Sequence, residues 1–454
     1  MLGMAALSVA LAHGAAAVPR DDGTAAASRA APANPEEFVN ILGGTQSKED
    51  FSYGNIMPDT TLPWGFNAWA PQTNNAGNGW WFTSWDRSFY GFRCTHQPSP
   101  WIGDYGVLRF SGGIIDESHH SESLFSAVDT RKSDLHPYYQ NHTLLAYGSR
   151  DGYLTAEIAP TEHGAIMRYN FPPYVARKEG GLAPGWNQTR RVWVSLNGGG
   201  GAVNANGSGP DADTGAAAPV LSGYTTAISR CKGCQHHFHA TVFGGADGST
   251  PIQPVATGTD KGWGWLDFDP KDANTQQLVV RVATSMISAS QAQTAHAAEV
   301  EKLDLESAVA AAKAVWNAEL AKITIDDMGP GYTPQEEHDW RVGFYSSLYR
   351  ASKFPRKLFE QDASGKDIHW SPSLGKVVDG VFSCDQVRLP ACLPACRRSG
   401  AHVNSAARDR AALIDPVAVR VGVRVCVCVC RASGTRTAVR TRCWRCGSRR
   451  AWRR

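Results

Sequence analysis

The sequence predicts an α+β protein of several domains: an N-terminal antiparallel β-sandwich, then a helical linker, then the start of a second, helical domain. Three observations support this prediction. Short runs rich in β-branched and aromatic residues, broken by Gly, Pro and Asn, fill residues 38–290. Apolar residues then recur mostly every three or four positions within residues 291–329. A helix-capping sequence at Thr333 finally opens residues 330–385.

The composition is that of a folded protein, with 454 residues, 42% of them hydrophobic, and a formal net charge of +3. It excludes a disordered chain and a collagen-like one. The charge is unevenly divided, because residues 385–454 contain 16 Arg, no Lys and three acidic residues. Residues 1–384 therefore carry a net charge of −10. After the N-terminus no apolar run reaches 18 residues, so we expect no membrane span.

The N-terminal region has the features of a secreted protein. Residues 1–17 are small and apolar and end in three Ala, which is typical of a signal peptide. Residues 18–37 lack apolar periodicity, which predicts a disordered leader. Three glycosylation sequons begin at Asn141, Asn187 and Asn206. Any one sequon can arise by chance, but together these features predict a secreted or secretory-pathway glycoprotein.

Six runs are predicted to form strands of the sandwich, namely residues 107–110, 153–158, 165–171, 191–196, 240–243 and 278–287. The third run shows the pattern most clearly. Its residues 165, 167, 169 and 171 are apolar or aromatic, while 168 and 170 are polar. This period of two is expected of a strand with one buried face.

The apolar period changes to that of a helix after residue 290, and we predict one long amphipathic helix there. The residues that set the period are Val300, Leu303, Leu305, Val309, Ala312, Val315, Trp316, Leu320 and Ile323.

A second helix is predicted to begin after Thr333, with Thr333 as N-cap, Pro334 at the first helical position and Glu336 able to reach back to the cap amide. Pro355 is expected to end it. Its buried stripe is predicted to consist of Trp340, Phe344, Leu348 and Ala351.

Residues 386–454 differ from the rest of the chain. Seven of the 11 Cys lie between Cys392 and Cys446, and residues 425–430 alternate Val and Cys, as a translated GTGTGT repeat does. We interpret this tail as an artefact, either intron read-through or a frameshift. A zinc site and an Arg-rich nucleic-acid tail are the competing interpretations. Because we exclude the tail from the fold, we expect no nucleic-acid partner.

Tryptophan is concentrated in residues 64–105, which hold six of the fifteen Trp. Aromatic rings stack on the apolar faces of sugars, while charged and amide groups bind hydroxyls. The same stretch supplies such polar groups, namely Asp86, Arg87, Arg93, His96, Gln97 and Asp104. The pattern favours a sugar site, and a Trp-rich core with polar surface groups is the alternative.

Cys231 and Cys234 have the spacing of a redox pair or of two zinc ligands, and His236, His237 and His239 follow them. In the secretory pathway such a pair is more often oxidised than metal-bound, so we predict a possible disulfide. Strand alternation would place His236 on the opposite face from the other two histidines, which disfavours a zinc site. Zinc remains the alternative.

Several motifs occur in the order known from one enzyme family. They are residues 39–45 (VNILGGT), 54–58 (GNIMP), 62–65 (LPWG), 91–106 (GFRCTHQPSPWIGDYG), 154–157 (LTAE), 163–169 (HGAIMRY) and 344–350 (FYSSLYR). In these motifs the chain resembles glycoside hydrolase family 92, whose members are α-mannosidases. The resemblance spans residues 38–384.

The resemblance implies a β-sandwich packed on an (α/α)6 barrel. It also implies an inverting, calcium-dependent exo-α-mannosidase that acts on α-mannoside glycans of glycoproteins or polysaccharides. Inversion needs two carboxyl groups about 6.5–9.5 Å apart. In the family these groups and the calcium ligands lie further along the barrel. We therefore expect residues 330–385 to be a truncated barrel start, the calcium ligands to lie outside this chain, and the chain to be inactive.

The motif positions also imply site residues. Arg93, His96 and Asp104 would form one edge of the mannose pocket, with Trp85, Asp86 and Trp101 as neighbours. His96 has three open interpretations: a sugar contact, a metal ligand or a satisfied core histidine. No catalytic residue is identified, and the acids at Glu360, Asp362, Asp367 and Asp379 are interpreted as solvated surface groups. A non-catalytic carbohydrate-binding sandwich is the alternative function.

Overall fold

The computed structural model describes residues 34–73, 81–97, 104–115, 124–129, 132–145, 152–174, 189–210, 217–228, 231, 233–325 and 331–382. The predicted signal peptide and tail lie outside the described residues, as do Trp101 and Asn187. At the end of the predicted leader, Pro35–Phe38 forms a short 3-10 helix in which Glu36 is buried. This end of the leader therefore belongs to the folded part.

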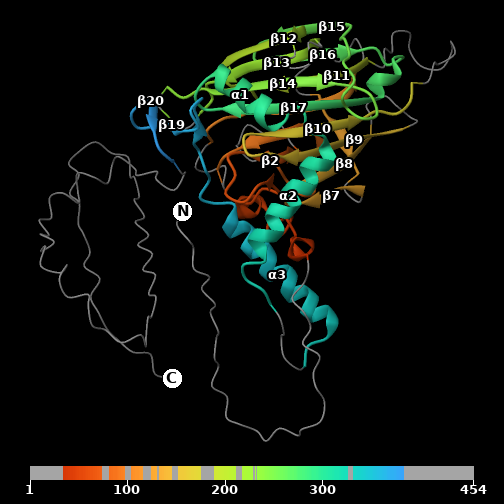
Figure 1. Cartoon of the computed structure of the whole chain (residues 1–454). Coiled ribbons are helices and arrows are strands. Elements are labelled where there is room, and N and C mark those ends of the chain that lie inside the picture. Colours follow the sequence, from red (N-terminus) through yellow and green to blue (C-terminus); the bar gives the residue numbers. More distant parts are fainter. Residues whose placement is uncertain are drawn as a thin grey trace, which may run out of the picture. The chain divides into compact units, whose positions relative to one another are not determined.

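Two antiparallel sheets dominate the described part of the chain (Figure 1). The seven-stranded sheet has the order β1 (Thr60–Thr61), β2 (Ala68–Gln72), β4 (Gly91–Thr95), β5 (Arg109–Ile115), β11 (Thr189–Ser195), β16 (Trp263–Phe268) and β15 (Ala256–Asp260).

The ten-stranded sheet has the order β12 (Gly201–Pro210), β13 (Ala217–Thr225), β14 (His236–Phe243), β17 (Gln277–Ser285), β10 (Gly164–Asn170), β9 (Tyr153–Pro160), β8 (Tyr139–Leu145), β6 (Ser126–Val128) and β3 (Ser88–Phe89). Its tenth strand, β7 (Asp134–His136), also pairs with β8.

One hydrophobic core lies between the two sheets, which confirms the predicted sandwich. The seven-stranded sheet contributes Trp69, Phe92 and Phe110, and the ten-stranded sheet contributes Met167 and Phe238. Each of the six predicted strand runs overlaps an observed strand. In these strands, residues two apart face the same side, so a single sequence pattern builds the whole core.

The outer face of the ten-stranded sheet is covered by helices α1 (Ala289–Glu299) and α2 (Leu305–Leu320) (Figure 1). The prediction of one long helix from Val300 to Ile323 was wrong. Asp304 accepts a hydrogen bond from the Ser307 amide at 2.6 Å and so starts a new helix as its N-cap. The intervening Val300 is fully buried, because it packs in the turn against the sheet.

Helix α3 (Pro334–Ser352) begins as predicted. Thr333 and Glu336 form the reciprocal capping box, and the helix ends before Pro355. Its predicted buried stripe was wrong by one position, because the fully buried aromatic residues are Tyr345 and Tyr349. Trp340 is 58% exposed, Ala351 is exposed, and Phe344 and Leu348 are only partly buried.

Helices α2 and α3 hold the segment from Asp59 to Asn67 against the sandwich. Trp316 Nε1 of α2 donates to the Thr61 carbonyl at 2.7 Å. Tyr349 of α3 donates its hydroxyl to the Asp59 carbonyl at 2.5 Å, and Lys353 pairs with the Asp59 carboxylate at 2.8 Å. These are buried interactions between residues far apart in the sequence, and they orient both helices on the sheet edge.

A small three-stranded sheet follows α3. It is formed by β18 (Glu360–Gln361), β19 (Asp367–Ser371) and β20 (Lys376–Asp379). The (α/α)6 barrel remains a prediction. Among the helices of the described residues, none has the length and apolar composition that crossing a membrane would require.

The buried indole of Trp316 gives a test of the helix–sheet contact. We expect Trp316→Ala to lower the free energy of unfolding by about 3–5 kcal/mol, because it leaves a cavity and removes the hydrogen bond to Thr61. The measurement is urea unfolding followed by circular dichroism. Val315→Ala on the same helix is the control, because Val315 is 45% exposed and should change stability by less than about 0.5 kcal/mol. Equal losses in both variants would contradict the contact.

Candidate functional site

The predicted sugar-binding residues lie on and around strand β4. Alternation along this strand directs Arg93 to the outer face of the seven-stranded sheet, where it pairs across to Ala70 and Arg109. Cys94, the next residue, points into the core between the sheets. One motif therefore supplies both a surface group and a buried one.

On the outer face Arg93 lies against one ring, Trp81, of a small aromatic group. Its guanidinium lies 4.0 Å from the centre of the Trp81 ring, and the Trp85 ring lies 5.5 Å from that of Tyr53. Tyr53 also packs against the small apolar cluster that contains Trp81. We call Tyr53, Trp81, Trp85, Asp86 and Arg93 the Trp85 patch. Within it, the Trp85 side chain is 43% exposed and so offers an open ring face.

Charge in the Trp85 patch comes from Arg93 and Asp86. Burial lowers the pKa of Arg93 to about 10, although the nearby charge of Asp104 acts to raise it. Because this pKa is still well above 7, the guanidinium is cationic at neutral pH. Its Nε atom is buried and has no hydrogen-bond partner among the described residues. The Asp86 carboxylate accepts from the Thr73 hydroxyl at 3.2 Å. A patch that combines an exposed aromatic ring with a cation and a carboxylate is suited to binding a polyhydroxylated ring.

His96 and Asp104 lie beneath the surface. His96 is fully buried, and its Nδ1 lies 3.1 Å from Asp104 Oδ1 while its Nε2 lies 3.0 Å from Asn67 Oδ1. Asp104 also accepts from the backbone amides of His96 and Tyr105 and from the Thr95 hydroxyl. With this arrangement Asp104 fixes the loop and the His96 ring.

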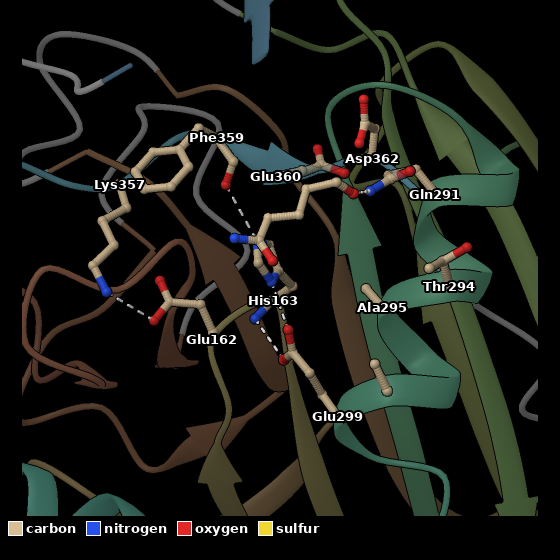
Figure 2. A pocket seen from close by; sticks show the side chains of 12 residues that line it. Glu162, His163, Gln291, Thr294, Ala295, Glu299, Lys357, Phe359, Glu360 and Asp362 are labelled. Atoms are coloured by element: carbon tan, nitrogen blue, oxygen red, sulfur yellow. Dashed lines mark hydrogen bonds and ion pairs between the residues drawn. The ribbon is translucent and has the colours of Figure 1, made fainter. Parts of the chain in front are cut away.

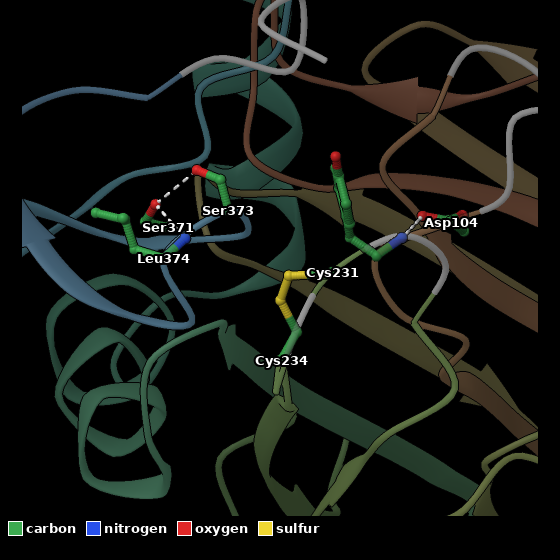
Figure 3. Close-up of a disulfide and its surroundings, with 7 residues drawn as sticks. Asp104, Cys231, Cys234, Ser371, Ser373 and Leu374 are labelled. Atoms are coloured by element: carbon green, nitrogen blue, oxygen red, sulfur yellow. Dashed lines mark hydrogen bonds between the residues drawn. A yellow bond between two sulfur atoms is a disulfide. The ribbon is translucent and has the colours of Figure 1, made fainter. Parts of the chain in front are cut away.

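The remaining predicted residues are separate from the patch. Asn206 is exposed and Asn141 is half-buried, and both lie in strands of the ten-stranded sheet. Cys231 and Cys234 are joined by a disulfide (Figure 3). The disulfide and Tyr105 line the same small cavity, so it lies close to the segment that carries Asp104.

A larger pocket of about 420 Å³ lies elsewhere, between the sandwich, α1 and the chain after α3 (Figure 2). We call it the His163 pocket. It is lined by Glu162, His163, Gln291, Thr294, Ala295, Ala298, Glu299, Lys357, Phe359, Glu360, Gln361 and Asp362.

A charged pair forms one wall of the His163 pocket. His163 Nδ1 lies 2.5 Å from Glu299 Oε1, and the second Glu299 oxygen accepts from the His163 amide at 2.9 Å. Burial alone would lower the pKa of His163, but the hydrogen bond and charge of Glu299 raise it to about 9. Burial acts to raise the pKa of Glu299, yet the bonded His163 holds it below its usual value. Both groups are therefore charged at neutral pH.

Glu360 corrects the interpretation that the acids after α3 are all surface groups. It is only 3% exposed, because β18 brings it against the end of β17. Its two oxygens accept from the Ser285 hydroxyl at 2.7 Å and the Met286 amide at 2.8 Å. Burial raises the pKa of Glu360, although these two hydrogen bonds act to lower it. With both oxygens already engaged, Glu360 holds β18 to the sandwich.

The His163 pocket was not found by sequence reasoning. His163 appeared only as one residue of a matching motif, and Glu299 was counted in a helical region. The pair joins residues 136 positions apart, so no local spacing signals it. One available signal was a histidine in the turn between two predicted strands, which is too common to identify a site.

The His163–Glu299 pair predicts a loss of stability at alkaline pH. The folded-state pKa of His163, about 9, exceeds its ordinary value of 6.5, so the pair stabilises fully below pH 6.5 and loses its contribution as pH rises through 9. We expect the free energy of unfolding of the natural chain to fall by about 1–3 kcal/mol more over this range than that of His163→Gln.

The measurement is urea unfolding at a series of pH values. His338→Gln is the matched control, because His338 forms an exposed pair with Asp339. It should keep the pH slope of the natural chain. A His163→Gln slope equal to that of the natural chain would show that the pair does not carry the effect.

The model of the glycosyl hydrolase family 92 N-terminal domain matches residues 38–285, and that of the family 92 catalytic domain matches residues 291–381. No significant match was found among curated protein sequences.

Solved structures agree with these matches. A family GH92 inverting mannosidase from Bacteroides thetaiotaomicron has 27% sequence identity and a TM-score of 0.61. The match covers 78% of this chain and 44% of the mannosidase chain. A GH92 family glycosyl hydrolase has 20% identity and a TM-score of 0.57, covering 77% and 45%. A GH92 α-mannosidase from B. thetaiotaomicron, in complex with mannoimidazole, has 16% identity and a TM-score of 0.54, covering 77% and 44%.

This chain thus spans less than half the length of these structures. The N-terminal domain match covers more than half of the chain and coincides with the sandwich. The chain belongs to glycosyl hydrolase family 92.

Proposed function

We propose that the chain is part of an inverting exo-mannosidase for α-mannosides, with the Trp85 patch as a mannose-binding surface of the sandwich. The observation that carries this proposal is the 43% exposed Trp85 ring, which contacts Tyr53 in the same patch where Arg93, a residue of the 91–106 motif, lies over the Trp81 ring. The inverting mannosidase from B. thetaiotaomicron supports the reaction type by similarity. N-glycan or mannan mannose is the proposed substrate class.

Within this proposal the patch residues have different roles. Trp85 stacks on the apolar face of the sugar, while Arg93 and Asp86 bind its hydroxyls. His96 and Asp104 act from below by fixing the end of β4 and the loop after it. We also propose that the protein is secreted or resides in the secretory pathway. The sequons and the apolar N-terminus are typical of proteins in that pathway, where N-glycans occur.

Calcium, implied by the family resemblance, takes about six to eight oxygen ligands. Within the part of the chain that the structure describes, the one group of three side chains placed to share an ion is Cys94, His96 and His236. Sulfur and nitrogen donors do not fit calcium, so we assign no step of the reaction to it.

A non-catalytic carbohydrate-binding sandwich is the second candidate. It is favoured by one observation: the Trp85 patch is built wholly from residues 53–93 of the sandwich region and uses no group from the catalytic-domain match. Binding through stacking and hydrogen bonds requires no acid–base pair. The two functions are therefore distinguished by turnover and not by affinity.

The binding role of the patch gives a direct prediction. Trp85→Ala should weaken binding of methyl α-mannoside by at least about tenfold, because the stacking surface is lost. Isothermal titration calorimetry on the full chain measures this. Trp340→Ala is the matched control, because it removes another exposed Trp, 58% exposed on α3, far along the sequence from the patch. Equal affinity of Trp85→Ala and the natural chain would remove the patch from the site.

Turnover separates the two candidate functions. If the chain is a mannosidase, para-nitrophenyl α-mannoside should release mannose first as the β-anomer, which proton NMR resolves. If it is a binding protein, methyl α-mannoside should bind while no mannose is released. Release of α-mannose first would contradict the inverting mechanism.

A further inference from the structure

A second group of side chains lies directly beneath the Trp85 patch, in the core between the sheets. It consists of Cys94, His96 and His236, all fully buried. Cys94 lies on β4 and His96 just beyond it, both from the seven-stranded sheet, whereas His236 begins β14 of the ten-stranded sheet. Their ligand atoms all lie within 4.8 Å of one another.

His236 is the unusual member of this group. Both of its ring nitrogens are buried and have no hydrogen-bond partner among the described residues. A buried polar atom without a partner is destabilising, so such atoms usually have a ligand, a water or a function. Its ring meets the His96 ring edge-on, with the ring centres 4.8 Å apart.

Room for the His236 ring is provided by Gly106. A Cβ atom at this position would lie 2.1 Å from His236 Nδ1, so a larger residue would displace the ring. Gly106 belongs to the same motif as Cys94 and His96. The motif therefore supplies two members of the group and the space for the third.

His96 is oriented as a metal ligand usually is. Its Nδ1 faces Asp104, which directs Nε2 towards Cys94 Sγ at 3.9 Å and Asn67 Oδ1 at 3.0 Å. A carboxylate on the far nitrogen is the common partner of a metal-bound histidine, because it fixes both the tautomer and the ring. Asn67 Oδ1 lies 3.3 Å from Cys94 Sγ, so an amide oxygen borders the group.

We propose that Cys94, His96 and His236 bind one zinc ion between the two sheets. A thiolate and two imidazoles are ligands that zinc accepts, and the fourth position is open to an oxygen donor such as water. Zinc–ligand distances of about 2.0–2.3 Å place the donors roughly 3.3–3.6 Å apart, so the side chains would close by about 1 Å on binding. The ion would join the sheets below the Trp85 patch and is independent of its proposed sugar-binding role.

The test uses cobalt(II), which replaces zinc and reports its ligands by colour. The full chain is prepared with the eight cysteines from Cys384 to Cys446 replaced by Ser, and the disulfide of Cys231 and Cys234 is kept oxidised. We expect one cobalt per chain, with tetrahedral visible bands and a thiolate charge-transfer band. Zinc should abolish both bands and raise the melting temperature.

Variants identify the ligands. Cys94→Ser should lose the charge-transfer band, and His236→Gln should weaken cobalt binding at least about tenfold. His142→Gln is the matched control, because it removes another buried histidine from the same sandwich and should bind as the parent does. Circular dichroism of the metal-free variants checks folding. If His236→Gln does not fold, the charge-transfer bands of the parent and of Cys94→Ser are compared, and this comparison tests the proposal.

Three outcomes would overturn the proposal. The first is that the parent binds neither cobalt nor zinc, the second is that Cys94→Ser keeps the charge-transfer band, and the third is that only copper(I) binds. Failure of methyl α-mannoside to bind leaves the zinc result standing, since that test addresses the Trp85 patch. The two proposals can thus fail separately.

Discussion

The segment from Asp59 to Asn67 is the constraint on which the rest of the structure depends. Its backbone carbonyls accept from Trp316 and Tyr349, and the Asp59 carboxylate is neutralised by Lys353. Both charges of that pair are nearly excluded from water, so removing either partner would leave an uncompensated buried charge. This segment fixes the helices, and through them the chain after α3, to the edge of the sandwich.

The same segment connects the two interior regions that matter most for function. The Phe66 ring lies 4.8 Å from the His163 ring and 5.9 Å from the His96 ring, measured between centres. Asn67, the next residue, contacts both His96 and Cys94. The His163 pocket and the proposed zinc site are therefore separated by one buried aromatic ring, and both depend on how the helices place this segment.

Strand alternation explains how one short motif serves two purposes. In β4, Arg93 faces outward to the Trp85 patch, while Cys94 faces the core. Asp104 returns from the following loop to hold His96 by its backbone and its ring. A sugar bound at the surface would thus rest on a strand whose inner face contributes Cys94 to the proposed zinc site.

The sequence by itself determined the sandwich, the start of α3 and the family, because strand period, capping boxes and motifs are local patterns. The sequence-based predictions were wrong where the outcome depends on contacts with distant parts of the chain. These places are the helix break at Asp304, the buried face of α3 and the burial of Glu360. Only the tertiary structure brought His163 to Glu299, and Cys94 to His236. Such pairs lie more than 100 residues apart, and the stacking of sheets and helices that joins them leaves no local signature.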